Sequence, residues 1–226
     1  MPGLLRAAWY IALKDLAIEW RTRTAFASGL VFAVLVLAVL FFSRDPTAVS
    51  SRDIAPGAIW VTFTFASMLG LNRAFMIERE QRALDGILLT PAPRTAVFWG
   101  KFIANLAFVG SIQAVSLPLF VLFYDVPVWI RLPELVLVIV MSTVAFVAVG
   151  TLLSAMAVRT RYAELMLPLL LLPFLVPPLV GGVQATARLL DGRPLSDVAG
   201  WLRLIAGFDL AFVALAASLF HVVLEE

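Results

Sequence analysis

Residues 78–94 hold the densest group of charged side chains in this 226-residue chain. The charges are mixed in sign, Glu78 and Arg82 have the i, i+4 order that stabilises a helix, and apolar residues lie among them. Such a surface suits docking to another protein, whereas a charge run without apolar residues would be an ordinary solvated connector. The side chains that would form it are Glu78, Arg79, Glu80, Arg82, Leu84, Asp85, Gly86, Ile87 and Leu88.

Catalytic groups are scarce. His221 is the only histidine and there is no cysteine, which removes thiol nucleophiles, thiolate metal sites and haem ligation by two histidines of one chain. The run Gly100-Lys101-Phe102 is not a phosphate-binding loop, because Thr95 stands where that loop needs glycine and no hydroxyl follows the lysine. We predict no catalytic residue, no metal site and no tightly bound cofactor in this chain.

Ionisable residues inside apolar spans are costly, so they are candidates for function. Asp209 is the clearest, about 12 Å along the helix from the start of its span. It could pair with a partner subunit, hydrogen-bond to an opened backbone or respond to a transport cycle. Arg73 and Lys101 lie near span ends, where snorkelling to the membrane surface accounts for them. Asn72, Asn105 and Gln113 would bridge helices by hydrogen bonds.

One apolar span carries four prolines, followed by Gly181 and Gly182. Because proline has no N–H, several intrahelical donors are missing, and we predict that the backbone breaks before the far surface. Broken helices surround substrate paths in transporters; a kinked packing helix is the other interpretation. The four residues are Pro168, Pro173, Pro177 and Pro178.

Six apolar stretches must position these side chains. The chain is 62% apolar and 14% charged, against about 25% charged residues in soluble domains, which excludes a soluble globular protein. Each stretch can cross a bilayer as a helix, and the continuous apolar runs do not fit barrel strands. The predicted fold is an all-α polytopic membrane protein, one domain over 1–226, with spans at 25–42, 58–77, 96–124, 135–158, 162–184 and 201–224. Tilt, a kink at Pro118 or an exposed end must absorb the excess length of 96–124.

The first 23 residues form a charged, amphipathic leader. We expect a helix along the membrane surface, the alternative being an extension of the first span. Its large apolar residues recur at helical spacing: Leu5, Trp9, Leu13, Leu16 and Trp20. An aromatic belt near span ends would account for most of the tryptophans, which are Trp9, Trp20, Trp60, Trp99, Trp129 and Trp201.

The Lys and Arg residues of the loops predict the orientation. Nine lie on the N-terminal side and five on the opposite side, so both termini should be cytoplasmic. The formal net charge of +2 gives no support for nucleic-acid binding.

Several segments resemble one known family. The run from Ile54 to Val61, Leu71-Asn72-Arg73-Ala74-Phe75, Glu78-Arg79-Glu80, the run from Ala83 to Pro91 and Gly100-Lys101 are similar to the cytochrome c maturation B, or haem exporter B, family of ABC permease subunits. Length, six spans and amphipathic leader fit as well, so the resemblance extends over nearly the whole chain.

The resemblance implies an ABC-2-like exporter permease of the bacterial inner membrane, two copies to a complex. Such a subunit lacks its own ATPase and works with a cytoplasmic ABC ATPase and two further small membrane proteins of the maturation system. That complex supports loading and release of a periplasmic haem chaperone, so ATP would bind in a partner and haem would be handled by the complex. By analogy, residues 78–94 would be the coupling segment that touches the ATPase.

Two other functions remain open from the sequence. One is an ABC exporter permease for another hydrophobic substrate, which would pair with an ATPase without affecting c-type cytochromes. The other is a non-transporting scaffold of the maturation complex, which would bind partners without responding to nucleotide.

Overall fold

The computed structural model describes residues 3–45, 47–80, 94–157 and 163–223, with side chains described except at 70, 72–80, 94, 157, 163–168 and 220–223. Every regular element in these ranges is helical, which confirms the predicted all-α class. The helices are α1 (Leu4–Thr22), α2 (Thr24–Ser43), α3 (Ser51–Glu80), α5 (Arg94–Tyr124), the short 3₁₀ helix η1 (Val128–Arg131), α6 (Leu132–Ala157), α7 (Ala163–Leu190) and α8 (Leu195–Val223).

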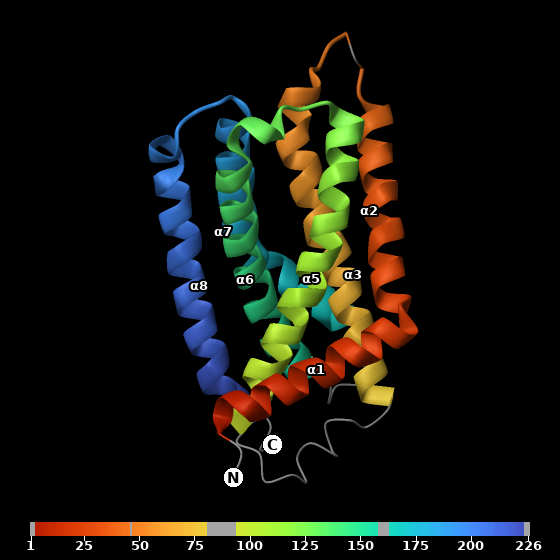
Figure 1. Ribbon diagram of the computed structural model, residues 1–226, viewed down its shortest axis with the longest axis vertical. Coiled ribbons are helices and arrows are strands. Elements are labelled where there is room, and N and C mark those ends of the chain that lie inside the picture. The colour runs from red at the N-terminus through yellow and green to blue at the C-terminus, as the bar shows by residue number, and fades with distance from the viewer. Residues whose placement is uncertain (1–2, 46, 81–93, 158–162, 224–226) are drawn as a thin grey trace.

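The six long helices run side by side, and α1 lies across one end of the bundle (Figure 1). We call this end, where α3 also finishes and α5 begins, the α1 end. Helix α6 packs against α3, α5, α7 and α8, while α3 packs against α2, α5 and α7. The core therefore runs the length of the bundle between α3, α5, α6 and α7, with α2 and α8 on its flanks.

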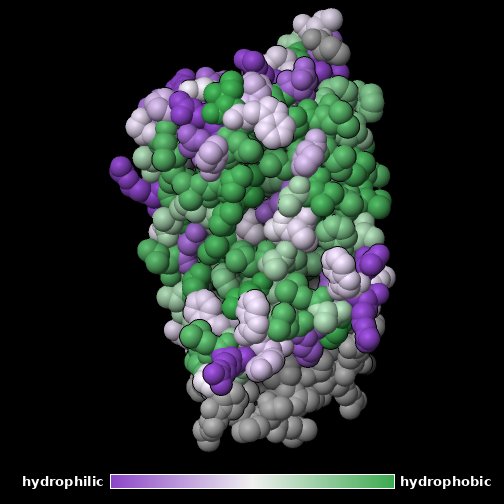
Figure 2. Space-filling model, in the orientation of Figure 1, coloured by the Kyte–Doolittle hydropathy of each residue, from purple (hydrophilic) through white to green (hydrophobic). Residues whose placement is uncertain are grey.

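The outer surface of the bundle suits a bilayer. Five helical segments of the described chain are long and apolar enough to cross one: those of α2, α5, η1 with α6, α7 and α8. The sixth predicted span falls on α3, which is not among these five and carries Arg52 and Asp53 in its first turn. Figure 2 shows a mostly apolar surface between two ends with more polar side chains. The polytopic prediction is confirmed.

Local chemistry explains where helices begin and turn. Arg23, in the left-handed region at φ 54°, separates α1 from α2, and the Glu19 carboxylate accepts a hydrogen bond of 2.9 Å from the N–H of Phe26 across this corner. At the start of α3, Ser50 Oγ donates to Asp53 and accepts from its N–H, which caps the helix. These contacts satisfy helix-end donors that apolar surroundings would leave unpaired.

The length of α5 is explained by α1. At 31 residues, α5 is about 46 Å long, more than the roughly 30 Å of hydrocarbon in a bilayer. Its first two turns pack against α1, although Val97 and Phe98 in these turns also join the core of the bundle, and Pro118 lies inside the helix. The extra length therefore lies at the level of the surface helix.

Helix α7 differs from its prediction. It runs without interruption from Ala163 to Leu190, through Pro168, Pro173, Pro177, Pro178 and both glycines, so the predicted break is wrong. Each proline removes only the bond of its own nitrogen, and α3, α6 and α8 pack along the helix. Packing against neighbouring helices lets proline persist within membrane helices.

Candidate functional site

The predicted coupling segment lies between two long helices. Glu78, Arg79 and Glu80 form the last residues of α3, and their side chains lie outside the described residues. Residues 81–93 are outside the described ranges entirely, and with them Arg82, Leu84, Asp85, Gly86, Ile87 and Leu88. Because α3 finishes and α5 begins at the α1 end, both ends of the segment are placed there.

Helix α1 packs directly on the first turns of α5. Gly100 makes this possible: a Cβ at this position would lie 2.7 Å from the Cβ of Ile11 and 2.8 Å from the carbonyl oxygen of Ala8. Ala7, Ala8 and Ala12 form the buried side of α1. The two backbones are thus held closer than ordinary side chains would allow.

The buried side of α1 is not the one that its large apolar residues indicated. Leu5, Trp9, Leu13 and Trp20 are exposed, Trp20 by 77%. Because a helix turns by about 100° per residue, these large apolar residues share one sector of its circumference. The buried alanines lie in a second sector, and the polar side chains of Arg6 and Arg21 lie in a third. Helix α1 is therefore amphipathic as predicted, with separate faces toward protein, apolar surroundings and water.

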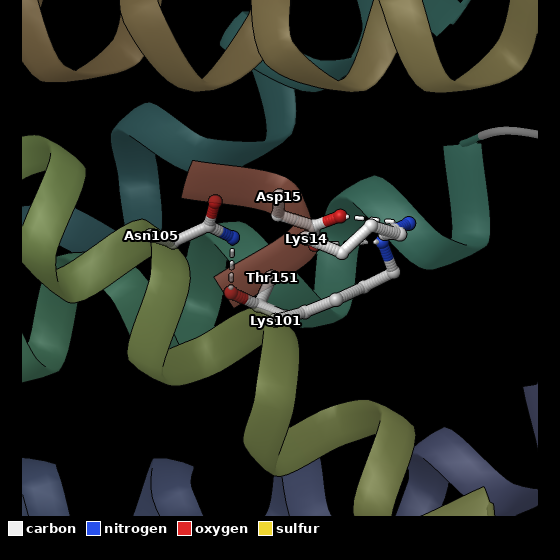
Figure 3. A network of polar contacts seen from close by, with 5 residues as sticks. All are labelled: Lys14, Asp15, Lys101, Asn105 and Thr151. Carbon is white, nitrogen blue, oxygen red and sulfur yellow. Dashed lines mark hydrogen bonds and ion pairs between the residues drawn. The ribbon is translucent and has the colours of Figure 1, made fainter. Parts of the chain in front are cut away.

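A buried ion pair joins α1 to α5 (Figure 3). Lys101 of α5 is only 4% exposed, and its Nζ lies 3.6 Å from Oδ2 of Asp15. Lys14, at the α1 surface, approaches the other carboxylate oxygen at 2.8 Å. The expected snorkelling of Lys101 is wrong, because α1 covers the ammonium and supplies its counter-charge.

Hydrogen bonds continue from this point along the α5–α6 interface. Asn105 Nδ2 donates to Thr151 Oγ1 at 3.1 Å, and Thr143 Oγ1 lies 2.7 Å from Gln113 Oε1. Asn105 and Gln113 are eight residues apart on α5, and their partners Thr151 and Thr143 are eight residues apart on α6 in the reverse direction. Both hydrogen bonds therefore fit one antiparallel register of the two helices. The predicted bridging by Asn105 and Gln113 is confirmed.

One contact between α3 and α7 was not predicted from the sequence. Trp60 is 1% exposed, so it is not part of an aromatic belt. Its Nε1 donates to Thr186 Oγ1 at 2.9 Å, and its ring lies where a Cβ on Gly182 would be, 2.6 Å away. The spacing of Gly182 and Thr186, two small residues four apart, was the available signal.

The remaining predicted residues are dispersed. Asp209 lies near the middle of α8, and its Oδ1 is buried without a hydrogen-bond partner in the described structure. The side chain of Arg73, on α3, is outside the described residues, as is that of His221, on α8. Two of the three intramembrane candidates flank the coupling segment: Arg73 lies five residues before it on α3, and Lys101 lies seven residues after it on α5.

Comparison with known proteins points to one family. A family model described as "CcmB protein" matches residues 6–225. "Heme exporter protein B" of Rhodobacter capsulatus is 30% identical over 206 residues, covering 89% of this chain and 91% of that protein. The protein of the same name from Paracoccus denitrificans is 31% identical over 91% of this chain and 93% of its own length. That of Pseudomonas aeruginosa is 27% identical, with coverage of 91% and 93%.

Proposed function

This chain belongs to the CcmB protein family, and from that premise we propose that it is a membrane permease subunit of an ABC complex for c-type cytochrome maturation. In this role it couples ATP hydrolysis by a partner chain to delivery of haem or to release of the loaded haem chaperone. Relatives that match nine-tenths of its length carry the name heme exporter protein B, which supports haem as the cargo of the complex.

The observation that carries the proposal is the attachment of α1 and α6 to α5, the helix that follows the coupling segment. A push on residues 78–94 enters the bundle through the end of α3 and the start of α5. The pair of Asp15 and Lys101 ties α1 to α5, and two hydrogen bonds tie α6 to it, one that Asn105 donates to Thr151 and one that Gln113 accepts from Thr143. Motion at the segment is thereby passed to three helices together.

The partners follow from the same proposal. A cytoplasmic ABC ATPase binds residues 78–94, two further membrane proteins of the maturation system and a periplasmic haem chaperone complete the assembly, and two copies of the permease are present. The chain lies in the bacterial inner membrane with both termini in the cytoplasm. It performs no catalysis of its own, and its apolar outer surface contacts lipid.

The test is reversal of charge in the coupling segment. We expect Glu78→Lys with Asp85→Lys to lower recovery of the ATPase with the purified full-length chain by about tenfold or more, because two attractive contacts become repulsive. Membrane insertion should not change. Asp191→Lys, an exposed acid at the opposite end of the bundle, is the matched control and should leave recovery as it is.

ATP hydrolysis by the complex, with and without the haem chaperone, separates the alternative functions. Turnover that responds to the chaperone and is lost in the double variant agrees with the proposal. An ATPase that is indifferent to the chaperone indicates an exporter of another substrate. Normal recovery of the ATPase with the double variant contradicts the role of residues 78–94.

A further inference from the structure

Asp209 is on the face of α8 that is turned toward the other helices. Ile205 and Ala216 are fully buried, and Asp209 lies between them at helical spacing, followed by Phe212. Its Oδ1 is shielded from solvent and accepts no hydrogen bond in the described structure. The residue as a whole is part-buried, so this oxygen is the part of the carboxyl group that the helices of the bundle enclose.

Two contacts fix which part of α7 lies opposite Asp209. Ile205 packs on Gly181, where a Cβ would lie 2.9 Å from its side chain, and the rings of Phe212 and Phe174 are 5.7 Å apart. The helices are antiparallel, so both contacts give the same register. Asp209 is four residues after Ile205 and three before Phe212, which places it level with Pro177.

The backbone of α7 is short of donors at this level. Pro177 and Pro178 have no N–H, so the carbonyl groups of Pro173 and Phe174 lose the donors that a regular helix would supply. A helical carbonyl points toward the residue four positions later, which is the level of the proline pair. Phe174 and Gly181 both contact α8, and Pro178, which lies between them at helical spacing on the same side of α7, is buried.

No cation of the neighbouring helices can balance a carboxylate at this position. The helices that pack on α8 have no charged residue between Lys101 and the end of α5, between Glu134 and the end of α6, or between Glu164 and Arg188 on α7. On α8 itself, Arg203 is exposed and lies about 120° around the helix from Asp209. An ionised carboxylate in these surroundings would be costly, whereas a protonated one needs only an acceptor.

We propose that Asp209 binds a proton within the membrane and donates it as a hydrogen bond to the carbonyl groups that Pro177 and Pro178 leave free on α7. The carboxyl group and the proline pair form one proton-binding site between α7 and α8. The site joins the two helices when the proton is bound and releases them when it is lost, since two unpaired acceptors then face each other. The proposal does not depend on the function argued above.

Infrared spectroscopy of the full chain tests the proton. The difference spectrum of wild type minus Asp209→Asn isolates one carboxyl group, and it should contain the carbonyl stretch of a protonated acid, shifted in D₂O. The amide of the variant keeps an N–H donor, so its melting temperature should stay within about 1 °C of wild type. A carboxylate band at neutral pH in place of the acid band would overturn the proposal.

A double-mutant cycle tests the acceptor. Asp209→Ala should lower the melting temperature by about 4 °C in the native sequence and by much less when Pro177→Ala and Pro178→Ala restore the missing donors. Pro173→Ala, one turn before Pro177 in α7, is the control background and should leave the effect of Asp209→Ala unchanged. Equal effects in all backgrounds would show that these carbonyl groups are not the acceptors.

Discussion

A single glycine determines how closely α3 and α7 approach. The ring of Trp60 lies against the backbone of α7 at Gly182, and its indole N–H reaches the hydroxyl of Thr186 one turn away. In a membrane the hydrophobic effect does not drive helices together, because lipid tails are as apolar as the side chains. Helix association therefore depends on close packing and on interhelical hydrogen bonds. This contact combines both, and it lies in the core that joins α3, α6 and α7.

We expect Gly182→Ala to lower the free energy of unfolding by about 1–3 kcal/mol, because the new methyl group would overlap the Trp60 ring and shift it from Thr186. Thermal unfolding in mild detergent measures the change. Gly110→Ala is the control: a Cβ there meets nothing within 4 Å, and alanine favours a helix, so stability should hold or rise slightly. Equal losses in the two variants would contradict the account of Gly182.

Helix α1 shows what sequence periodicity can predict and what it cannot. Its spacing of large apolar residues correctly predicted an amphipathic helix, but the side that binds the protein consists of Ala7, Ala8 and Ala12. Alanine and glycine contribute little to a hydrophobic pattern, yet they determine which helix faces can touch. The spacing of Ala8 and Ala12, four residues apart on the side that packs on α5 at Gly100, was the usable signal.

The ion pair beneath α1 escaped prediction for a different reason. Asp15 and Lys101 are 86 positions apart, and each alone looked like a charge near a membrane surface. The all-α class and most span positions followed from apolar length, which is local. Pairings between distant helices, and the continuity of α7 through its prolines, depend on tertiary packing that no single segment encodes.

Asp15→Asn should loosen α1 from α5. The buried ammonium of Lys101 would lose a charged acceptor, and we expect a loss of about 1–3 kcal/mol in unfolding free energy. Protease cleavage within α1 in detergent should become faster. Lys14→Met is the control, since the Lys14 side chain is 39% exposed and should contribute less than about 1 kcal/mol. In a double-mutant cycle with Lys101→Met the losses should be less than additive; strict additivity would mean that the two residues do not interact.

At the scale of the whole molecule, the two ends of the bundle differ. The α1 end receives the surface helix and both ends of residues 81–93, whereas the opposite end carries the short connections of the helix pairs α2–α3 and α7–α8 (Figure 1). An ATPase in the cytoplasm requires the α1 end to face inward, which agrees with the larger number of Lys and Arg residues on that side. Orientation is therefore a condition of the proposed function that can be tested separately.

The absence of natural cysteine makes that test direct. Ala48→Cys places a thiol in the exposed connection of α2 and α3, and Ala17→Cys places one on the exposed side of α1. A membrane-impermeant maleimide added to spheroplasts should label Cys at position 48 and leave position 17 unmodified until the membrane is opened. Inverted vesicles should give the opposite result, and the parent chain should take no label in either. Labelling of position 17 from outside would place the coupling segment on the wrong side for a cytoplasmic ATPase, and the proposed function would fail with it.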